Sequence, residues 1–138
     1  MKILPSDQFV HRLARLIFKK EKAHPRGDLN IVFVKNPQIK KINKRFFKKD
    51  KTTDVIAFPY SPLSDTIPEA TFGDIFISVP TARMNSRRLK EPLKKELARL
   101  VVHGILHLLG HKDDNKRRRT LMWRRQEEIV NSVFQSQK

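Results

Sequence analysis

The chain has 138 residues, and it carries 30 Lys and Arg against 14 Asp and Glu, which gives a formal net charge of +16. The length is typical of a single domain, here 1–138, and the absence of cysteine excludes disulfides, thiolate metal sites and a cysteine nucleophile. So large a positive excess favours nucleic acid as a partner, because a cationic surface attracts polyanions. We expect no signal peptide, and no apolar run reaches membrane-spanning length, so we expect a cytoplasmic protein without a membrane partner.

The spacing of apolar residues predicts helices and short strands that follow one another along the chain. The predicted elements are, in order, a helix from Ser6, a strand at Leu29–Val34, a helix from Asn36, a strand at Thr53–Tyr60, an exposed loop at Ser61–Phe72, a strand at Gly73–Val79, a helix at Pro80–Leu89, a long helix from Pro92, and a last helix from Asn115 into the 130s. Gly110 is placed to end the long helix, because glycine accepts the left-handed conformation of a C-terminal cap. We therefore expect an α/β (α+β) fold, in which helices pack on a small mixed β-sheet.

Two histidines on the long helix form a candidate metal site. His103 and His107 are four residues apart, so their side chains lie one above the other on the same helical face, about 5–6 Å apart at Cβ. Two imidazoles in this arrangement can hold one divalent cation, as they do in zinc hydrolases. Gly110 then turns the chain, so that a residue shortly after it can return as a third ligand.

The third ligand has several candidates. Asp113 occupies the last position of the spacing H-x-x-x-H-x-x-G-x-x-D, where the metzincin signature has a third histidine. A carboxylate oxygen can also bind zinc, so Asp113 is the first choice. His111 is an alternative, and so is Asp114, although Asp114 could instead cap the last helix.

The residue after the first histidine limits the reaction class. Zinc proteases of this type have a glutamate there as general base, and this chain has Gly104. Peptide hydrolysis of that type is therefore not expected. An iron oxygenase with two histidine ligands and one carboxylate ligand is another reaction class, but this chain agrees with it only in the types of ligand.

Sequence motifs occur in a defined order along the chain. Residues 43–46 read NKRF, 52–59 read TTDVIAFP, 73–77 read GDIFI and 103–113 read HGILHLLGHKD. In order and spacing, these segments resemble the motifs N-x-x-[YF]-R with P-T-D-V-L-S-F-P, G-D-I-x-I and H-G-x-L-H-L-x-G-x-x-H of the YbeY family of bacterial rRNA-maturation endoribonucleases. The resemblance extends from residue 29 to residue 130, which is most of the chain.

The resemblance implies a metal-dependent α/β hydrolase that cleaves single-stranded RNA, matures the 16S rRNA 3′ end and takes part in ribosome quality control. It implies one divalent ion, with zinc as the first expectation and Mn, Ni or Fe as alternatives. His103 and His107 would act in catalysis through this ion, and the third ligand position falls on Asp113. The implied partners are rRNA and components of the small ribosomal subunit, and no DNA specificity is expected.

Two positions depart from the family pattern. One is Asp113, and the other is Phe47, where the family usually has an arginine that lines the cleft. Arg45 does not simply replace that arginine, because two residues along a helix are separated by about 200°. If the altered site cleaves poorly, the alternative function is a catalytically weak RNA-binding factor in ribosome assembly.

Basic residues gather at 40–51, at 83–90 and at 116–125, and each group could follow a phosphate backbone. Phe46 and Trp123 lie within the first and third groups, and we interpret both as core residues rather than as base-stacking residues. The residues predicted to contact RNA are Arg45, Lys48, Lys49, Arg83, Arg87 and Arg88.

Overall fold

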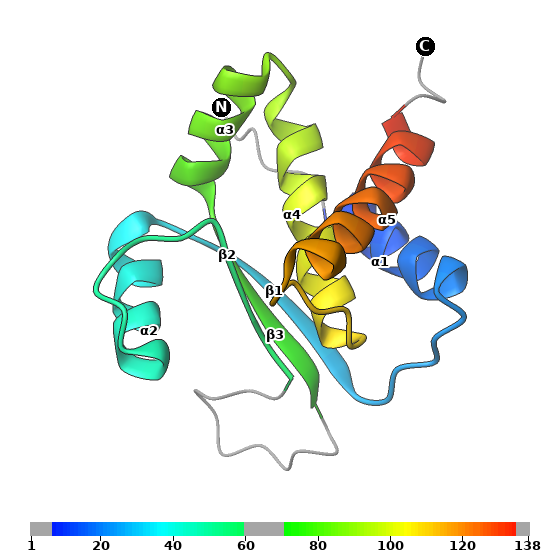
Figure 1. Cartoon of the computed structure of the whole chain (residues 1–138), viewed down its shortest axis with the longest axis horizontal. Coiled ribbons are helices and arrows are strands. Elements are labelled where there is room, and N and C mark those ends of the chain that lie inside the picture. Colours follow the sequence, from blue (N-terminus) through cyan, green and yellow to red (C-terminus); the bar gives the residue numbers. More distant parts are fainter. Residues whose placement is uncertain (1–6, 60–70, 135–138) are drawn as a thin grey trace.

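The computed structural model describes residues 7–59 and 71–134, and the predicted helices and strands are found there with shifted ends (Figure 1). Their bounds are α1 Asp7–Lys20, β1 Asp28–Val34, α2 Asn36–Phe47, β2 Val55–Phe58, β3 Thr71–Ser78, α3 Val79–Leu89, α4 Leu93–Leu108 and α5 Lys116–Phe134. None of the helices in the described ranges combines the length and hydropathy that crossing a bilayer requires.

The strands form one mixed sheet in the order β1-β3-β2. β1 runs parallel to the central strand β3, and β2 runs antiparallel to it. A strand that is covered on both faces needs apolar residues at consecutive positions, and Ile75, Phe76 and Ile77 of β3 are all buried. The prediction of an α/β fold with a small mixed sheet is confirmed.

Each face of the sheet packs against its own helices, which gives three layers (Figure 1). Ile75 and Ile77 belong to the larger core, which β3 shares with α1, α4 and α5. Phe76 points to the opposite face and packs in a smaller core with Ile39 of α2. This alternation follows from the two-residue period of a strand. On the larger-core side α4 packs directly on β2 and β3, and α1 and α5 both pack against α4.

Two glycines allow α4 to approach the sheet closely. A Cβ atom on Gly104 would lie 2.9 Å from two side-chain atoms of Ile75, and one on Gly73 would lie 2.6 Å from the backbone oxygen of Phe58 and 2.6 Å from Leu108. Gly104 is thus a packing residue at the interface of α4 with β3. The lack of a side chain there, which argues against a protease, has a structural cause.

Strand pairing moves several of the predicted boundaries. Thr71 and Phe72 belong to β3 rather than to the predicted loop, because β3 extends along β1 from the pair Asp28–Thr71 onward. The rest of that loop prediction, like the end of the predicted second strand at Tyr60, lies outside the described residues. Val79 is the first residue of α3 instead of the last of the strand, because Ser78 caps α3 by accepting from the Thr81 amide at 3.2 Å.

Candidate metal centre and its clefts

The end of α4 turns the chain back over the two histidines. Gly110 has a φ of +101°, a conformation that favours glycine. Its amide donates to the carbonyl of His107 at 3.0 Å, and the His111 amide donates to the carbonyl of Leu106 at 3.0 Å. These two bonds are those of a Schellman C-cap. The reversal brings Asp113 back beside the helix it has just left.

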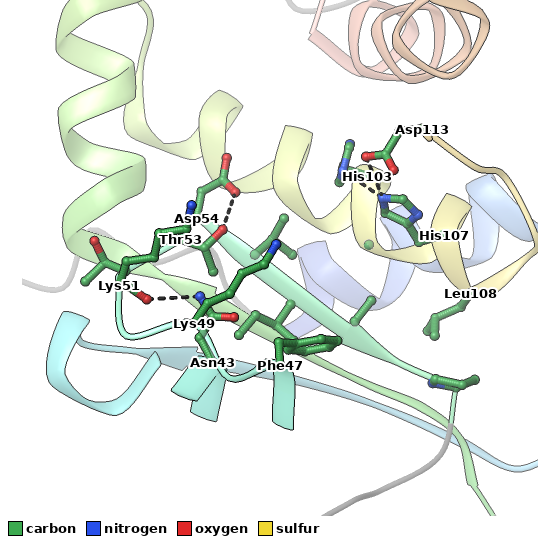
Figure 2. Close-up of a pocket in the computed structure, with 16 residues that line it drawn as sticks. Asn43, Phe47, Lys49, Lys51, Thr53, Asp54, His103, His107, Leu108 and Asp113 are labelled. Atoms are coloured by element: carbon green, nitrogen blue, oxygen red, sulfur yellow. Dashed lines mark hydrogen bonds and ion pairs between the residues drawn. The ribbon is translucent and has the colours of Figure 1, made fainter. Parts of the chain in front are cut away.

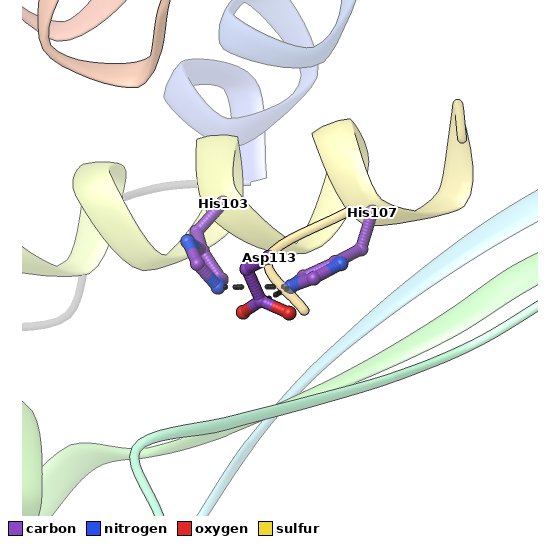
Figure 3. A group of neighbouring side chains, drawn as sticks. All are labelled: His103, His107 and Asp113. Carbon is purple, nitrogen blue, oxygen red and sulfur yellow. Dashed lines mark hydrogen bonds and ion pairs between the residues drawn. The ribbon is translucent and has the colours of Figure 1, made fainter. Parts of the chain in front are cut away.

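His103, His107 and Asp113 meet at one point (Figure 3). The two Nε2 atoms are 3.1 Å apart, and Asp113 Oδ2 lies 3.4 Å from His107 Nε2. One ligand atom from each of the three residues falls within 4.8 Å of the others, so the group could hold a metal ion. The three candidate ligands of the spacing H-x-x-x-H-x-x-G-x-x-D therefore lie close together in space.

The outer nitrogens of the two imidazoles each meet an acceptor. His103 Nδ1 lies 2.8 Å from Oε1 of Gln126 on α5, and His107 Nδ1 lies 3.2 Å from the carbonyl oxygen of His111. The Gln126 amide is oriented by its own bond from Nε2 to Glu127 Oε2, at 3.1 Å. Each Nδ1 therefore carries the proton and donates it, which leaves both Nε2 atoms with lone pairs.

The lone pairs of two Nε2 atoms 3.1 Å apart repel each other, and a cation that accepts both of them would remove the repulsion. The carboxylate of Asp113 adds negative charge at the same point. Burial lowers the pKa of His107, the neighbouring His103 lowers it further, and Asp113 acts in the opposite direction. The net shift is downward, so His107 is neutral near pH 7 and can donate its lone pair. This set of donors fits a divalent ion.

The alternative third ligands lie elsewhere. The Nε2 atom of His111 pairs with Glu21 Oε1 at 2.6 Å, which ties the turn after α4 to the end of α1. Asp114 pairs with the Arg118 guanidinium at 2.9 Å. The possible helix-capping role of Asp114 is also not found, because Asn115 accepts from the Arg118 amide at 2.8 Å and caps α5.

Two clefts meet at the centre and share Asp54, His103 and Asp113 in their walls. The first, here called the α2 cleft, has a volume of about 730 Å³ and lies between α4, β2 and the end of α2. The second, here called the α5 cleft, has a volume of about 600 Å³ and is lined by residues of α3, α4 and α5. The candidate ligands therefore lie in an open groove rather than in a closed pocket.

The wall of the α2 cleft opposite the histidines is basic (Figure 2). Lys49 and Lys51 line it from the segment between α2 and β2. The buried side chain of Asn43 holds this segment by donating to the Lys51 carbonyl at 3.0 Å. Asn43 belongs to one of the motifs noted in the sequence, but its positioning role becomes visible only when the loop is folded over it.

The predicted RNA-contacting residues divide into two groups. Lys49 lines the α2 cleft and Arg88 lines the α5 cleft. The others are exposed but line neither cleft, namely Arg45, Lys48, Arg83 and Arg87. The sequence reasoning did not single out Lys51 and Arg119, which line the α2 and α5 clefts respectively; both belong to the basic runs, where nothing distinguishes a cleft residue from its neighbours.

The aromatic residues near the clefts differ from expectation in one case. Phe46 packs against the smaller core as predicted, and Arg45 places its guanidinium over the Phe46 ring at 4.9 Å, away from the cleft. Trp123, also interpreted as a core residue, is 60% exposed and lines the α5 cleft, so that interpretation is wrong. Phe47 lines the α2 cleft at the position of the family's arginine and stacks on Phe58, with ring centroids 5.6 Å apart.

The fold and the site define a small α/β protein with a His-His-carboxylate group at the junction of two open clefts. A family model described as "Endoribonuclease YbeY" matches residues 4–134, and the chain belongs to this family.

Several relatives carry the same description. An endoribonuclease YbeY of Acholeplasma laidlawii is 39% identical over 76% of this chain and 74% of its own, and one of Flavobacterium psychrophilum is 32% identical over 91% and 85%. The solution structure of TM1509 from Thermotoga maritima is similar with a TM-score of 0.63 at 28% identity, covering 96% of this chain and 88% of that one.

Proposed function

We propose that this protein is a metal-dependent endoribonuclease that cleaves single-stranded RNA. The observation that carries the proposal is the convergence of two imidazole Nε2 atoms and a carboxylate at the junction of two open clefts. The two clefts extend from the candidate ligands in different directions, which suits attack within a strand better than attack at an end. Membership of a family described as endoribonucleases supports the same reaction.

In this proposal the side chains have separate roles. His103, His107 and Asp113 hold the ion, and Gln126 and the His111 carbonyl keep the two imidazoles in the tautomer that presents Nε2. When bound, the ion supplies Lewis acidity and activates water for hydrolysis of a phosphodiester. Lys49 and Lys51 attract the RNA backbone on the wall facing the histidines.

The ion we propose is Zn²⁺, with Mn²⁺, Fe²⁺ or Ni²⁺ as alternatives. Two imidazoles and one carboxylate are a known zinc ligand set. A carboxylate also carries negative charge and a harder donor atom than a third imidazole, which moves the preference toward Mn²⁺ and Fe²⁺. Asp113 is about half exposed, with 48% of its side chain accessible, so the ligand can adjust to ions of different size.

Metal analysis of protein purified without chelator tests the ligand set. We expect about one divalent ion per chain in the wild type, a loss of binding in His103→Ala and Asp113→Ala, and retention of it in His111→Ala. The His111→Ala variant is the matched control, because it removes a neighbouring imidazole that pairs with Glu21 instead. Binding that survives in Asp113→Ala but fails in His111→Ala would make His111 the third ligand.

A cleavage assay on single-stranded RNA tests the activity. Metal-dependent cleavage by the wild type that is lost in a folded His103→Ala variant supports the proposal. Equal cleavage by both proteins would indicate a contaminating nuclease and overturn the proposal.

The cellular role that we propose is maturation of the 16S rRNA 3′ end and ribosome quality control in the cytoplasm, with small-subunit components as partners.

The second candidate is an RNA-binding factor in ribosome assembly with weak catalysis. It is favoured by the two family positions that are altered here, Asp113 and Phe47. Restoring them separates the two functions. If Phe47→Arg combined with Asp113→His raises a low wild-type cleavage rate by an order of magnitude or more, the altered positions limit catalysis and the binding role is supported.

A further inference from the structure

We infer that the α5 cleft is a second RNA-binding subsite, in which the Trp123 ring stacks on an unpaired base and Arg119 and Arg88 hold the adjoining backbone. The inference deepens the proposed function and rests on it, because it gives the RNA strand a path on both sides of the candidate metal centre. It assigns a ligand-binding role to a face of the molecule formed by α3, α4 and α5.

The α5 cleft begins at the candidate centre itself. Its walls include His103 and Asp113, which belong to the metal-ligand group, and it continues from there to Trp123 on α5. Arg119 connects the two ends, because its Nη1 atom lies 3.4 Å from the carbonyl oxygen of Asp113. Arg119 and Trp123 are four residues apart, so both side chains lie on the same face of α5.

The chemistry of this cleft suits a nucleotide. Trp123 is 60% exposed although it lines a cleft, so much of its side chain is accessible to a flat partner. Base–aromatic stacking needs such a face and works with every base. Arg88 lines the same cleft from the end of α3. Among the described residues, neither Arg88 nor Arg119 forms an ion pair with a carboxylate, so both guanidiniums can meet phosphate.

A protein partner fits this face less well than RNA does. Trp123 shares the cleft with Arg88 and Arg119, and the whole chain carries a formal net charge of +16. Of the acidic residues that line the cleft, Glu96 is paired with Arg99, and Asp54 and Asp113 lie where the two clefts meet. Single-stranded nucleic acid combines aromatic faces with regularly spaced negative charge, which is the complement of this arrangement. The α2 cleft repeats the pattern on the other side of the centre, where Phe47 is 47% exposed beside Lys49 and Lys51.

Trp123 is the only tryptophan in the chain, so its fluorescence reports on this cleft alone. The full chain with its metal is titrated with a 2′-O-methylated single-stranded oligoribonucleotide of about 12 nucleotides, which matches the length that such binding sites cover. We expect the oligonucleotide to quench the fluorescence and inorganic polyphosphate, which has charge without bases, to leave it nearly unchanged. Binding of the oligonucleotide without any quenching would overturn the inference.

Binding by variants is followed through the anisotropy of a labelled oligonucleotide. Trp123→Ala is expected to weaken binding about 5- to 100-fold, and Trp123→Phe to keep most of the affinity. Leu121→Ala is the matched control, since Leu121 is 53% exposed on the same helix but does not line the α5 cleft. Equal affinity of Trp123→Ala and the wild type, or an equal loss in Leu121→Ala, would contradict a stacking role.

The two proposals fail in different ways. Quenching by the oligonucleotide without cleavage of unmodified RNA would leave the subsite in place and remove the catalytic function. If the wild type cleaves RNA and the Trp123→Ala variant keeps the wild-type KM and kcat, the catalytic function stands and the subsite is ruled out. With both proposals correct, Trp123→Ala raises KM much more than it lowers kcat, because stacking away from the reacting phosphate contributes to ground-state and transition-state binding alike.

Discussion

The protonation of the two imidazoles depends on groups that do not touch the candidate ligand atoms. Gln126 accepts from His103 across the gap between α5 and α4, and Glu127 holds the Gln126 amide in the orientation that presents its oxygen. Glu127 is itself held by Arg99, which donates to both carboxylate oxygens at 2.8 and 3.0 Å. A chain of polar contacts therefore extends from a half-buried ion-pair network to the candidate metal centre.

Gln126→Leu tests this chain of contacts. The leucine fills a similar volume but leaves the Nδ1 proton of His103 without an acceptor, so we expect the affinity for Zn²⁺ to fall about 10- to 100-fold. A titration against a competing chelator measures the change. Gln126→Glu keeps an acceptor and should retain most of the affinity, and unaltered affinity in the leucine variant would contradict the positioning role.

Among the elements, α4 depends on its contact with β3 more than on its own helix propensity. Gly104 lies in the helix interior, where alanine is favoured over glycine by about 1 kcal/mol in free energy of helix formation. Packing against the sheet favours glycine instead, because the Cβ atom of an alanine would come within 2.9 Å of the Ile75 side chain. The two effects thus make opposite predictions for one substitution.

We expect Gly104→Ala to lower the free energy of unfolding by about 1–3 kcal/mol, the usual cost of overpacking a core. Gly73→Ala should cost more, because the atom met at 2.6 Å includes a backbone oxygen that cannot rotate away. Chemical denaturation of both variants provides the measurement. A stabilised Gly104→Ala variant would mean that the helix shifts easily off the sheet.

The connection of α1 to α5 and to the turn after α4 depends on Glu21. Burial acts to raise the pKa of Glu21, but hydrogen bonds from Arg125 and His111 outweigh it and hold the pKa below its ordinary value of 4.5. A carboxyl whose pKa is lowered by folding stabilises the native state above its unfolded pKa. That contribution is lost as the pH falls below 4.5 and through the lower folded-state pKa.

Glu21→Gln should therefore be less stable than the wild type at pH 6 to 7 by about 1.5–3 kcal/mol, the value of hydrogen bonds to charged groups. The difference should shrink as the pH falls through 4.5 and below. Thermal unfolding of both proteins across this pH range measures it. A stability difference that stays constant down to pH 3 would show that the lost contribution is not that of the ionised carboxylate.

For the molecule as a whole, the net charge of +16 predicts that RNA binding weakens steeply with salt. The clefts predict which cations matter. Replacing Lys49 and Lys51 together by Gln should reduce the slope of log K against log salt by about 1.4, since each phosphate contact on a single strand contributes about 0.7.

Arg83→Gln combined with Arg87→Gln is the matched control for this prediction. It removes the same charge from exposed residues that line neither cleft, and its slope should stay close to that of the wild type. Filter binding at several salt concentrations compares the two double variants. An equal reduction of the slope in both double variants would mean that RNA binding depends on the total charge and not on the cleft residues.

The sequence by itself determined the elements, the mixed sheet and the histidine pair, because each depends on spacing along the chain. His103 and His107 share a face through the helical repeat alone, and Gly110 marks the turn through its backbone freedom. The motifs that resemble those of the family include Asn43 and Gly73 and placed Asp113 at the third ligand position, but they did not state what Asn43 and Gly73 contact.

Only the tertiary structure decided which side chains of different elements contact one another. Helical phase no longer applies beyond Gly110. The choice of Asp113 rather than His111 as neighbour of the histidine pair therefore depended on where the turn places each side chain, and on Glu21, which directly follows α1 and pairs with His111. Trp123 looked like a core residue because its type is usually buried. It is exposed because the packed face of α5 is formed by Met122, Ile129 and Val130, and Trp123 faces the cleft.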